Sequence, residues 1–315
     1  MPNRFFPETS VVVLRAQRLL KLPWLVHGFS TRPGATSPVY GGASLNLAFT
    51  NDASKYAVER NRAMFLSKVG AVDGLDTRPA RARSRKDRGN NFRVWPLITL
   101  RQVHSDIIRF VDSPGGAHLV GDGLITSTPG LLLAIHTADC LPVILADSKH
   151  RTVGVFHAGW RGTLRRIVEK GVGEMRRFFG THPRYIKAAI GPGIHACCYQ
   201  VGDEVREKFE SQFSYAARLF REVKESDPVR EKYPLLFLAA RPPGHSDLPK
   251  KIFLDLVEAN RQQLLAVGVK PGNIDVSPLC TSCRTDLLFS YRAEKGKTGR
   301  MMAVAGIKQS NKRQS

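Results

Sequence analysis

Three side chains that bind transition metals occur in the middle of the chain, each beside a run of strand-forming residues. His104 follows the apolar stretch 96–100, and Cys140 interrupts a longer apolar run. His157 closes the run that begins at Thr152. This placement predicts that all three lie at strand ends. Two imidazoles and a thiolate suit zinc or copper, and three protein ligands leave a fourth position for water or substrate, as in catalytic sites.

Each of these residues also has an ordinary structural explanation. A buried Cys often packs as a small hydrophobe, and a His at a strand end is often a polar residue whose hydrogen bonds are satisfied. The spacing alone therefore leaves open whether the three residues form one metal site or are separate parts of the core.

Length and composition indicate a globular protein with a substantial core, since 42% of its 315 residues are hydrophobic. The apolar stretches 130–135 and 141–146 are far shorter than the ~20 residues that span a bilayer, so we expect no membrane partner. Five cysteines, with two adjacent at 197 and 198, make a poor disulfide framework and fit a reducing compartment. We therefore expect a cytoplasmic protein.

A formal net charge of +21 raises the question of nucleic-acid binding. Much of this charge lies in the segment 78–93 and in the tail after Lys308, which have no periodic apolar residues. Aromatic residues do not interleave with these cations as they do in a base-stacking platform. We interpret 78–91 as a basic insertion and 309–315 as a disordered basic tail, and we expect no specific nucleic-acid partner.

The remaining pattern predicts a single α/β domain without repeats or linkers. The polar turn 147–151 separates two apolar runs and indicates a hairpin. Thr163 is expected to cap a helix whose apolar positions continue to Phe179. The expected strands are 131–135, 141–146, 152–156, 186–190 and 301–307, and further helices are expected at 201–213 and 253–267.

The motifs around the three metal-binding residues resemble the signature of a known family. QVHS, TADCLPV and HAGWRG occur in the order found in the YfiH laccase-domain family, polyphenol-oxidase-like proteins now regarded as purine nucleoside phosphorylases. The similarity also covers 27–30, 42–47, 61–62, 289–292 and 298–301. It implies a layered α/β/β/α domain with mixed sheets over residues 23–308, preceded by an N-terminal strand or extension at 1–22.

Two candidate site residues are neighbours of the ligands in sequence. Asp139 could orient a ligand or take a proton, or it could only cap a turn. Phosphorolysis, which the resemblance implies, needs an anion site near C1′ of the ribose, and Arg161 beside the start of a helix is the leading candidate. A surface arginine packed on Trp160 is the alternative.

The resemblance adds two candidates for substrate binding and one for support of the site. Arg292 stands in the C-terminal motif and could complete the pocket, and Asn46 stands in the N-terminal motif and could bind ribose or base, or could be a turn residue. His136 is expected to lie behind the ligands. Cys280 and Cys283 form a lone CxxC without a partner pair, so we expect no second zinc site there.

Three enzyme classes follow from these residues and the resemblance. The first is a metal-dependent purine nucleoside phosphorylase acting on adenosine, inosine and 5′-methylthioadenosine, with adenosine deamination as a side activity and Zn²⁺ or Cu²⁺ as cofactor. The second uses Cys140 as a nucleophile to remove misincorporated L-Ser from peptidoglycan precursors. The third is a copper-dependent polyphenol oxidase, although none of the nine histidines forms an HxH pair. The expected partners are purine nucleosides and phosphate, in a monomer or homodimer.

Overall fold

The computed structural model describes residues 11–38, 40, 43–50, 53–73, 93–115, 119–224, 232 and 250–309. The predicted basic insertion 78–91 and the predicted tail beyond Gln309 lie outside these residues. Within the described part, no helix is both long and apolar enough to cross a membrane.

In the larger of two central sheets, two of the predicted metal ligands lie at the open end of a hairpin. Strands β11 (Leu141–Asp147) and β12 (Thr152–Ala158) are antiparallel, with Leu141 opposite Ala158, so the predicted hairpin is confirmed. Cys140 immediately precedes β11, and His157 is the second-last residue of β12. The six strands run in the order β17 (Ile274–Val276), β13 (Ile186–Ile190), β11, β12, β9 (Gly123–Thr126) and β8 (Ile108–Phe110).

The second sheet contains both the first and the last strand of the described residues. Its strands run in the order β1 (Val13–Leu14), β2 (Leu25–Ser30), β18 (Met301–Ile307), β10 (Leu132–Thr137) and β7 (Leu97–Ile98). Strand β18 pairs with both β2 and β10, so the C-terminal strand lies at the centre of the sheet. Strand β1 lies within the range 1–22 predicted as an N-terminal strand or extension, and it pairs with β2 in this sheet.

Alternate residues of β11 pack into different layers, as expected for a strand buried on both faces. Val143 and Leu145 pack in a core with α4 (Ile167–Phe179) and α8 (Leu256–Ala266). Ile144 and Ala146 pack instead between the two sheets.

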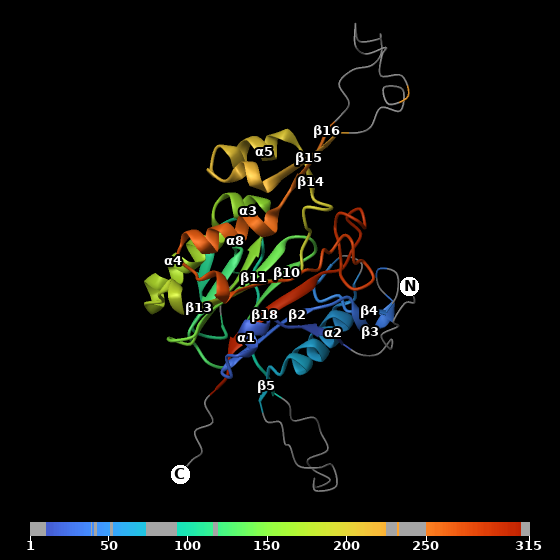
Figure 1. Cartoon of the computed structure of the whole chain (residues 1–315). Helices are drawn as coiled ribbons and strands as arrows, with labels where there is room; N and C mark the ends of the chain where they lie inside the picture. The colour runs from blue at the N-terminus through green and yellow to red at the C-terminus, as the bar shows by residue number, and fades with distance from the viewer. Residues whose placement is uncertain are drawn as a thin grey trace, which may run out of the picture.

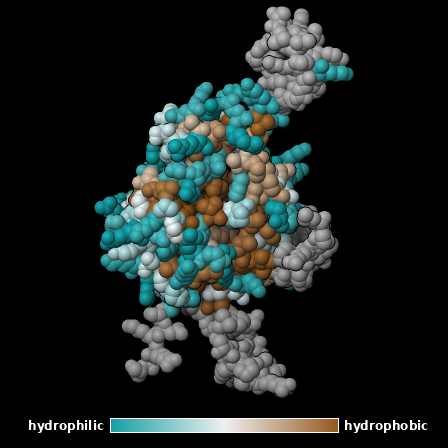
Figure 2. All heavy atoms as spheres, in the orientation of Figure 1, coloured by the Kyte–Doolittle hydropathy of each residue, from teal (hydrophilic) through white to brown (hydrophobic). Residues whose placement is uncertain are grey.

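The other sheet is covered in the same way on its outer face. Phe65 and Leu66 of α2 (Lys55–Val69) pack against Leu132, Ala134 and Met302. The order of layers is thus α2, five-stranded sheet, six-stranded sheet, then α4 with α8 (Figure 1). This confirms the expected α/β/β/α arrangement with mixed sheets. On the face in Figure 2, hydrophilic side chains surround a central hydrophobic area.

Smaller elements complete the domain around this frame. Strands β14 (Gln200–Val201), β16 (Lys250–Leu254) and β15 (Phe220–Lys224) form a three-stranded sheet beside α5 (Asp203–Glu210). The short pairs are β3 (Pro33–Pro38) with β4 (Ala43–Ser44), and β5 (Val72–Asp73) with β6 (Arg93–Val94). The short helix α1 (Gln17–Leu20) follows β1.

Several helix boundaries differ from those expected. The predicted helix after the HAGWRG motif is split into α3 (Trp160–Leu164) and α4, because Arg166 adopts a left-handed backbone with φ of 63°. Thr163 consequently lies inside α3 and does not cap it. The helices expected at 201–213 and 253–267 begin at 203 and 256, because the preceding residues pair in the three-stranded sheet.

Candidate metal centre and adjoining pocket

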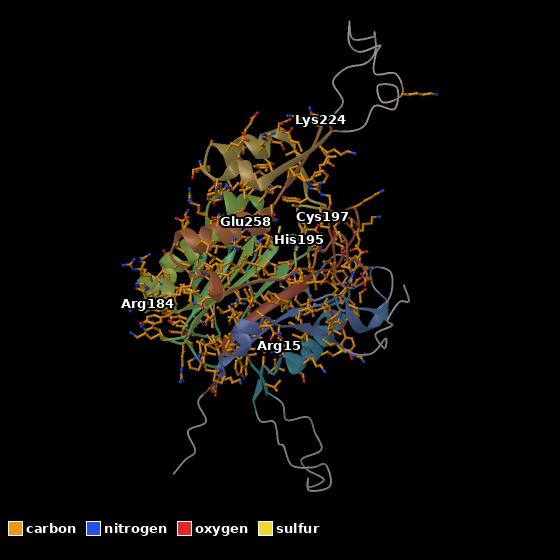
Figure 3. All side chains as sticks on the ribbon, viewed as in Figure 1. Arg15, Arg184, His195, Cys197, Lys224 and Glu258 are labelled. Carbon is orange, nitrogen blue, oxygen red and sulfur yellow. The ribbon has the colours of Figure 1, made fainter. Side chains whose placement is uncertain are left out.

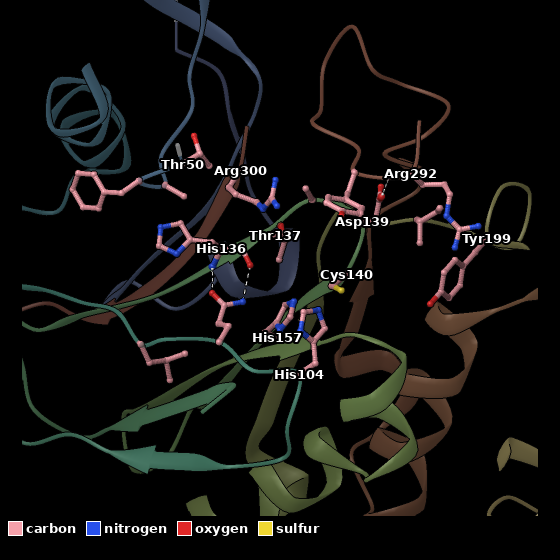
Figure 4. A pocket seen from close by; sticks show the side chains of 17 residues that line it. Thr50, His104, His136, Thr137, Asp139, Cys140, His157, Tyr199, Arg292 and Arg300 are labelled. Carbon is pink, nitrogen blue, oxygen red and sulfur yellow. Dashed lines mark hydrogen bonds between the residues drawn. The ribbon is translucent and has the colours of Figure 1, made fainter. Parts of the chain in front are cut away.

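His104, Cys140 and His157 lie together in the structure. One ligand atom of each residue is within 4.8 Å of those of the other two, and the two imidazole rings meet edge to face with centroids 4.9 Å apart. Figure 4 shows the three side chains converging at the base of a pocket. They come from the loop before β8, the residue before β11, and the end of β12.

Asp122, a buried carboxylate, holds two of these three residues in place. Its Oδ1 accepts hydrogen bonds from His157 Nδ1 at 2.8 Å and from the His104 backbone N–H at 3.1 Å. Its Oδ2 accepts from the backbone N–H of Ser105 at 2.6 Å and from that of Val103 at 3.2 Å. Since Nδ1 of His157 is engaged in this way, Nε2 is the nitrogen left to bind a metal.

The same contacts determine the ionisation of the carboxylate. Burial raises the pKa of Asp122, but hydrogen bonds from His157 and Ser105 outweigh it and lower the pKa to about 2. The carboxylate is therefore charged at neutral pH. A charged acceptor at Nδ1 favours the tautomer of His157 that a metal ligand requires.

Cys140 and His157 also shift each other's protonation. Burial raises the pKa of the Cys140 thiol, but the neighbouring His157 charge and hydrogen bonds from both histidines lower it overall. Burial lowers the pKa of His157, but the Cys140 and Asp122 charges raise it overall. The protein thus stabilises a thiolate, which is the form of cysteine that binds metals.

The backbone leaves space where the three donor groups converge. A Cβ added at Gly159 would lie 2.9 Å from Cys140 Sγ and 3.2 Å from His104 Cδ2. Gly159 precedes α3 with an ordinary extended backbone, φ −74° and ψ 171°, so its missing side chain serves the site and not the turn. A pair of imidazoles with one thiolate is a donor set that zinc and copper accept.

A cavity of about 680 Å³ opens above the three residues. Three aromatic side chains line it, of which Phe49 and Tyr291 are 56% and 54% exposed. In Figure 4, Arg300 and His136 lie on one side of the metal-binding cluster, and Arg292 and Tyr199 lie on the other. The lining residues are Ala48, Phe49, Thr50, Leu100, Gln102, His104, His136, Thr137, Ala138, Asp139, Cys140, His157, Ile194, Tyr199, Tyr291, Arg292 and Arg300.

Asp139 lines this cavity, but its carboxylate is engaged with the C-terminal loop. Oδ1 accepts from the hydroxyls of Thr281 and Ser290, both at 2.7 Å. Oδ2 accepts from the backbone N–H of Arg292 at 2.6 Å. Asp139 itself has φ of 93°, a conformation that non-glycine residues rarely adopt, and these bonds hold it there. The geometry favours positioning of Cys140 over proton transfer.

Asn46 is absent from the cavity lining and is fully hydrogen-bonded. Its Oδ1 accepts from the backbone N–H groups of Ala48 and Arg300, at 3.2 and 2.9 Å. Its Nδ2 donates to Ala48 O and Thr50 Oγ1, at 3.0 and 3.2 Å. The expected contact of Asn46 with ribose or base thus finds no support in this geometry, because Asn46 instead holds residues that line the pocket.

The two arginines expected at the site have different positions. Arg292 lines the cavity, where its guanidinium donates to Gln200 O at 2.8 Å and lies 5.5 Å from the Tyr199 ring centroid. Arg161 is exposed, does not line the cavity, and stacks 4.4 Å from the Trp160 ring centroid. This is the arrangement expected of a surface arginine, so the geometry does not support Arg161 as the phosphate site.

His136 lines the pocket wall and does not lie behind the ligands as expected, since its hydrogen-bond partners are Gln102, Arg62 and Leu47. Gln102 clamps its backbone by donating to His136 O and accepting from His136 N, both at 2.8 Å. The Nε2 atom of His136 lies 3.2 Å from both Arg62 Nη2 and Leu47 O. Burial and the Arg62 charge lower the pKa of His136 to about 3, so this imidazole is neutral.

Sequence reasoning missed Asp122 and Arg300 as site residues. Asp122 stands between two glycines immediately before strand β9, and that pattern is the signal that could have marked it. Arg300 was noted only as part of a C-terminal motif. In the structure it lines the pocket, and its guanidinium lies 5.6 Å from the Tyr291 ring centroid.

Comparisons with known proteins agree with this architecture. The model of the family described as "Multi-copper polyphenol oxidoreductase laccase" matches residues 76–308. A "Purine nucleoside phosphorylase" of Deinococcus radiodurans is 35% identical over 292 residues, covering 92% of each chain. "Adenosine deaminase RL5", from an unknown prokaryotic organism, is 35% identical over 213 residues, covering 65% of this chain and 72% of its own. The crystal structure of YlmD from Geobacillus stearothermophilus matches with a TM-score of 0.71 and 30% identity, covering 98% of this chain and 100% of that one. The chain therefore belongs to this laccase-domain family, the YfiH family whose motifs it carries.

Proposed function

We propose that this protein is a metal-dependent purine nucleoside phosphorylase, with adenosine, inosine and 5′-methylthioadenosine as substrates. The observation that carries the proposal is the convergence of His104, Cys140 and His157 at the base of a cavity lined by aromatic and cationic side chains. Relatives named purine nucleoside phosphorylase support the same reaction class. The reaction is a glycosyl transfer, in which phosphate replaces the purine at C1′ of the ribose.

The three donor groups fit Zn²⁺, with Cu²⁺ as the other metal such a set accepts. When bound, the cation would supply Lewis-acid chemistry at the base of the pocket. Asp122 would keep His157 in the binding tautomer, and Gly159 would keep the space clear. Asp139 would hold the loop that joins Cys140 to the pocket wall.

The pocket wall offers groups suited to the purine of a nucleoside and to phosphate. Phe49, Tyr199 and Tyr291 present aromatic surface on which a purine can stack. Arg300 and Arg292 are the cationic side chains that line the cavity, so we assign phosphate to them in place of Arg161. A phosphate oxygen forms the new bond to C1′ as the bond to the purine nitrogen breaks, and the purine leaves with that electron pair.

The test is incubation of purified, metal-quantified protein with inosine or adenosine, with and without phosphate. Free base and ribose 1-phosphate, resolved by chromatography, should form only with phosphate. Arg300→Ala should raise KM for phosphate at least tenfold, whereas Arg176→Ala, on the exposed face of α4, should not change it. A rise in KM on Arg161→Ala with no change on Arg300→Ala would return the anion site to Arg161.

Adenosine deamination is the second candidate, favoured by the relative named adenosine deaminase. The same pocket would have to admit water in place of phosphate. Formation of inosine from adenosine in the absence of phosphate distinguishes the two reactions. Loss of both activities in Cys140→Ala would place them at one site.

A further inference from the structure

Four cysteines outside the site described above form a second cluster. Cys197 and Cys198 follow β13, whereas Cys280 and Cys283 form the CxxC after β17. Their four Sγ atoms lie within 4.8 Å of one another, and none of them is in a disulfide. The CxxC expected to stand alone therefore has a partner pair, which is distant in sequence and adjacent in space.

The spacing of the sulfurs matches one metal ion better than a disulfide. Cys283 Sγ lies 3.5 Å from Cys197 Sγ and 3.3 Å from Cys198 Sγ. Zinc–sulfur bonds of about 2.3 Å in a tetrahedron separate the sulfurs by roughly 3.8 Å. A disulfide requires about 2.05 Å. Both measured distances are therefore closer to the tetrahedral value.

The backbone around the CxxC forms a turn and directs one N–H group at a sulfur of the cluster. The CxxC residues make a tight turn in which Arg284 N–H donates to Cys280 O at 3.1 Å. The backbone N–H of His195 donates to Cys280 Sγ at 3.5 Å. N–H groups directed at sulfur stabilise its thiolate form. Figure 3 marks His195 and Cys197 in this part of the molecule.

We propose that Cys197, Cys198, Cys280 and Cys283 bind a second divalent cation of the zinc class, with a structural role. Four protein ligands would leave no open coordination position, in contrast to the His2Cys cluster. The proposal is independent of the reaction assigned to the pocket.

Such an ion would join the two segments that form one wall of the pocket. The backbone already links them, since Thr281 N–H donates to Gly193 O at 3.0 Å. Thr281 Oγ1 also bonds Asp139, the residue before the ligand Cys140. Tyr199 and Arg292 continue from these segments into the cavity lining. Loss of the ion should therefore loosen the pocket wall and leave the three ligands of the first site in place.

The test is the zinc content of the purified full-length protein and of matched variants. The wild type should contain two equivalents, Cys140→Ala should keep one, and the double variant Cys197→Ser/Cys283→Ser should keep the other. X-ray absorption of zinc in Cys140→Ala should show four sulfur neighbours at about 2.3 Å. The double variant should also melt at a lower temperature than the wild type.

A second measurement covers the case in which the double variant does not fold. A thiol-reactive mercurial added to Cys140→Ala should release its remaining zinc in step with the titration of four thiols. A single equivalent in the wild type, lost entirely in Cys140→Ala, would overturn the proposal. So would a disulfide between Cys283 and Cys197 or Cys198, found by mass spectrometry in freshly isolated protein, because the cluster would then be a redox pair.

Discussion

Replacement of Asp122 by Asn changes one carboxylate oxygen to an amide nitrogen and should weaken metal binding, because Asp122 orients His157 and the loop that carries His104. If the amide nitrogen takes the place of Oδ2, it faces the N–H donors of Ser105 and Val103, and those hydrogen bonds are lost. If it takes the place of Oδ1, it faces Nδ1 of His157. The imidazole would then carry its proton on Nε2, the atom needed by the metal.

Either orientation has a cost of predictable size. Hydrogen bonds to a charged acceptor contribute roughly 1.5–3 kcal/mol each, so the first orientation, which loses two, should lower the free energy of unfolding by about 3 kcal/mol or more, and the second, which loses the one from His104 N–H, by about half of that. Removing a carboxylate that orients a metal-bound imidazole typically weakens metal binding by about 10–100-fold. We expect both effects in Asp122→Asn.

The assay compares zinc affinity, measured by competition with a chromophoric chelator, and urea unfolding of the metal-free protein. Asp112→Asn is the matched control, since this exposed carboxylate bonds only the neighbouring Ser113 hydroxyl among the side-chain hydrogen bonds of the described residues. Zinc affinity within about twofold of wild type in a folded Asp122→Asn protein would refute the reasoning.

Three further outcomes follow from the structure and sequence. Gly159→Ala should lower zinc affinity by at least tenfold because the added methyl group enters the metal site. The control Gly173→Ala, at a position in α4 with open space around it, should keep zinc affinity and stabilise the protein by about 0.5–1 kcal/mol. Equal zinc affinity in the two variants would contradict this. His27 is buried with a pKa lowered to about 4, chiefly by burial, and its Nε2 accepts from Ala16 N–H. Because the unfolded chain protonates this imidazole near the ordinary pKa of 6.5, the free energy of unfolding decreases as the pH falls from about 6.5 toward 4. From about pH 7 to about pH 5 the wild type should therefore lose about 2 kcal/mol more unfolding free energy than His27→Gln, as measured by urea unfolding at each pH. The same pH dependence in both proteins would show that another group is responsible. Deletion of 78–91 should reduce heparin binding and preserve nucleoside turnover; lost turnover would make the segment part of the active site.

Local patterns predicted the elements that carry the metal site. The hairpin of β11 and β12 follows from two apolar runs around a polar turn, and its register alone brings Cys140 near His157. By contrast, the break between α3 and α4 depends on one left-handed residue, Arg166, and the stretch 163–170 contains no glycine or proline to indicate it. Propensity therefore predicted one continuous helix where the chain has two.

Long-range polar contacts explain the remaining differences. Asp122 reaches His157 across 35 positions, and Cys198 reaches Cys283 across 85, distances over which periodicity gives no information. Asn46 was expected at the substrate because its motif matches the family. Its side-chain amide instead makes hydrogen bonds within its own loop and with the backbone of Arg300, and the sequence does not indicate these contacts.

The most direct test of the central claim is the stoichiometry of products from one nucleoside in one reaction. Zinc-loaded wild type, given inosine and phosphate, should form hypoxanthine and ribose 1-phosphate in equal amounts, and Cys140→Ala should form neither. Free ribose in place of the phosphate ester would show hydrolysis. Absence of base release from any nucleoside, together with phenol oxidation by copper-loaded protein or removal of L-Ser from a muropeptide, would contradict the account.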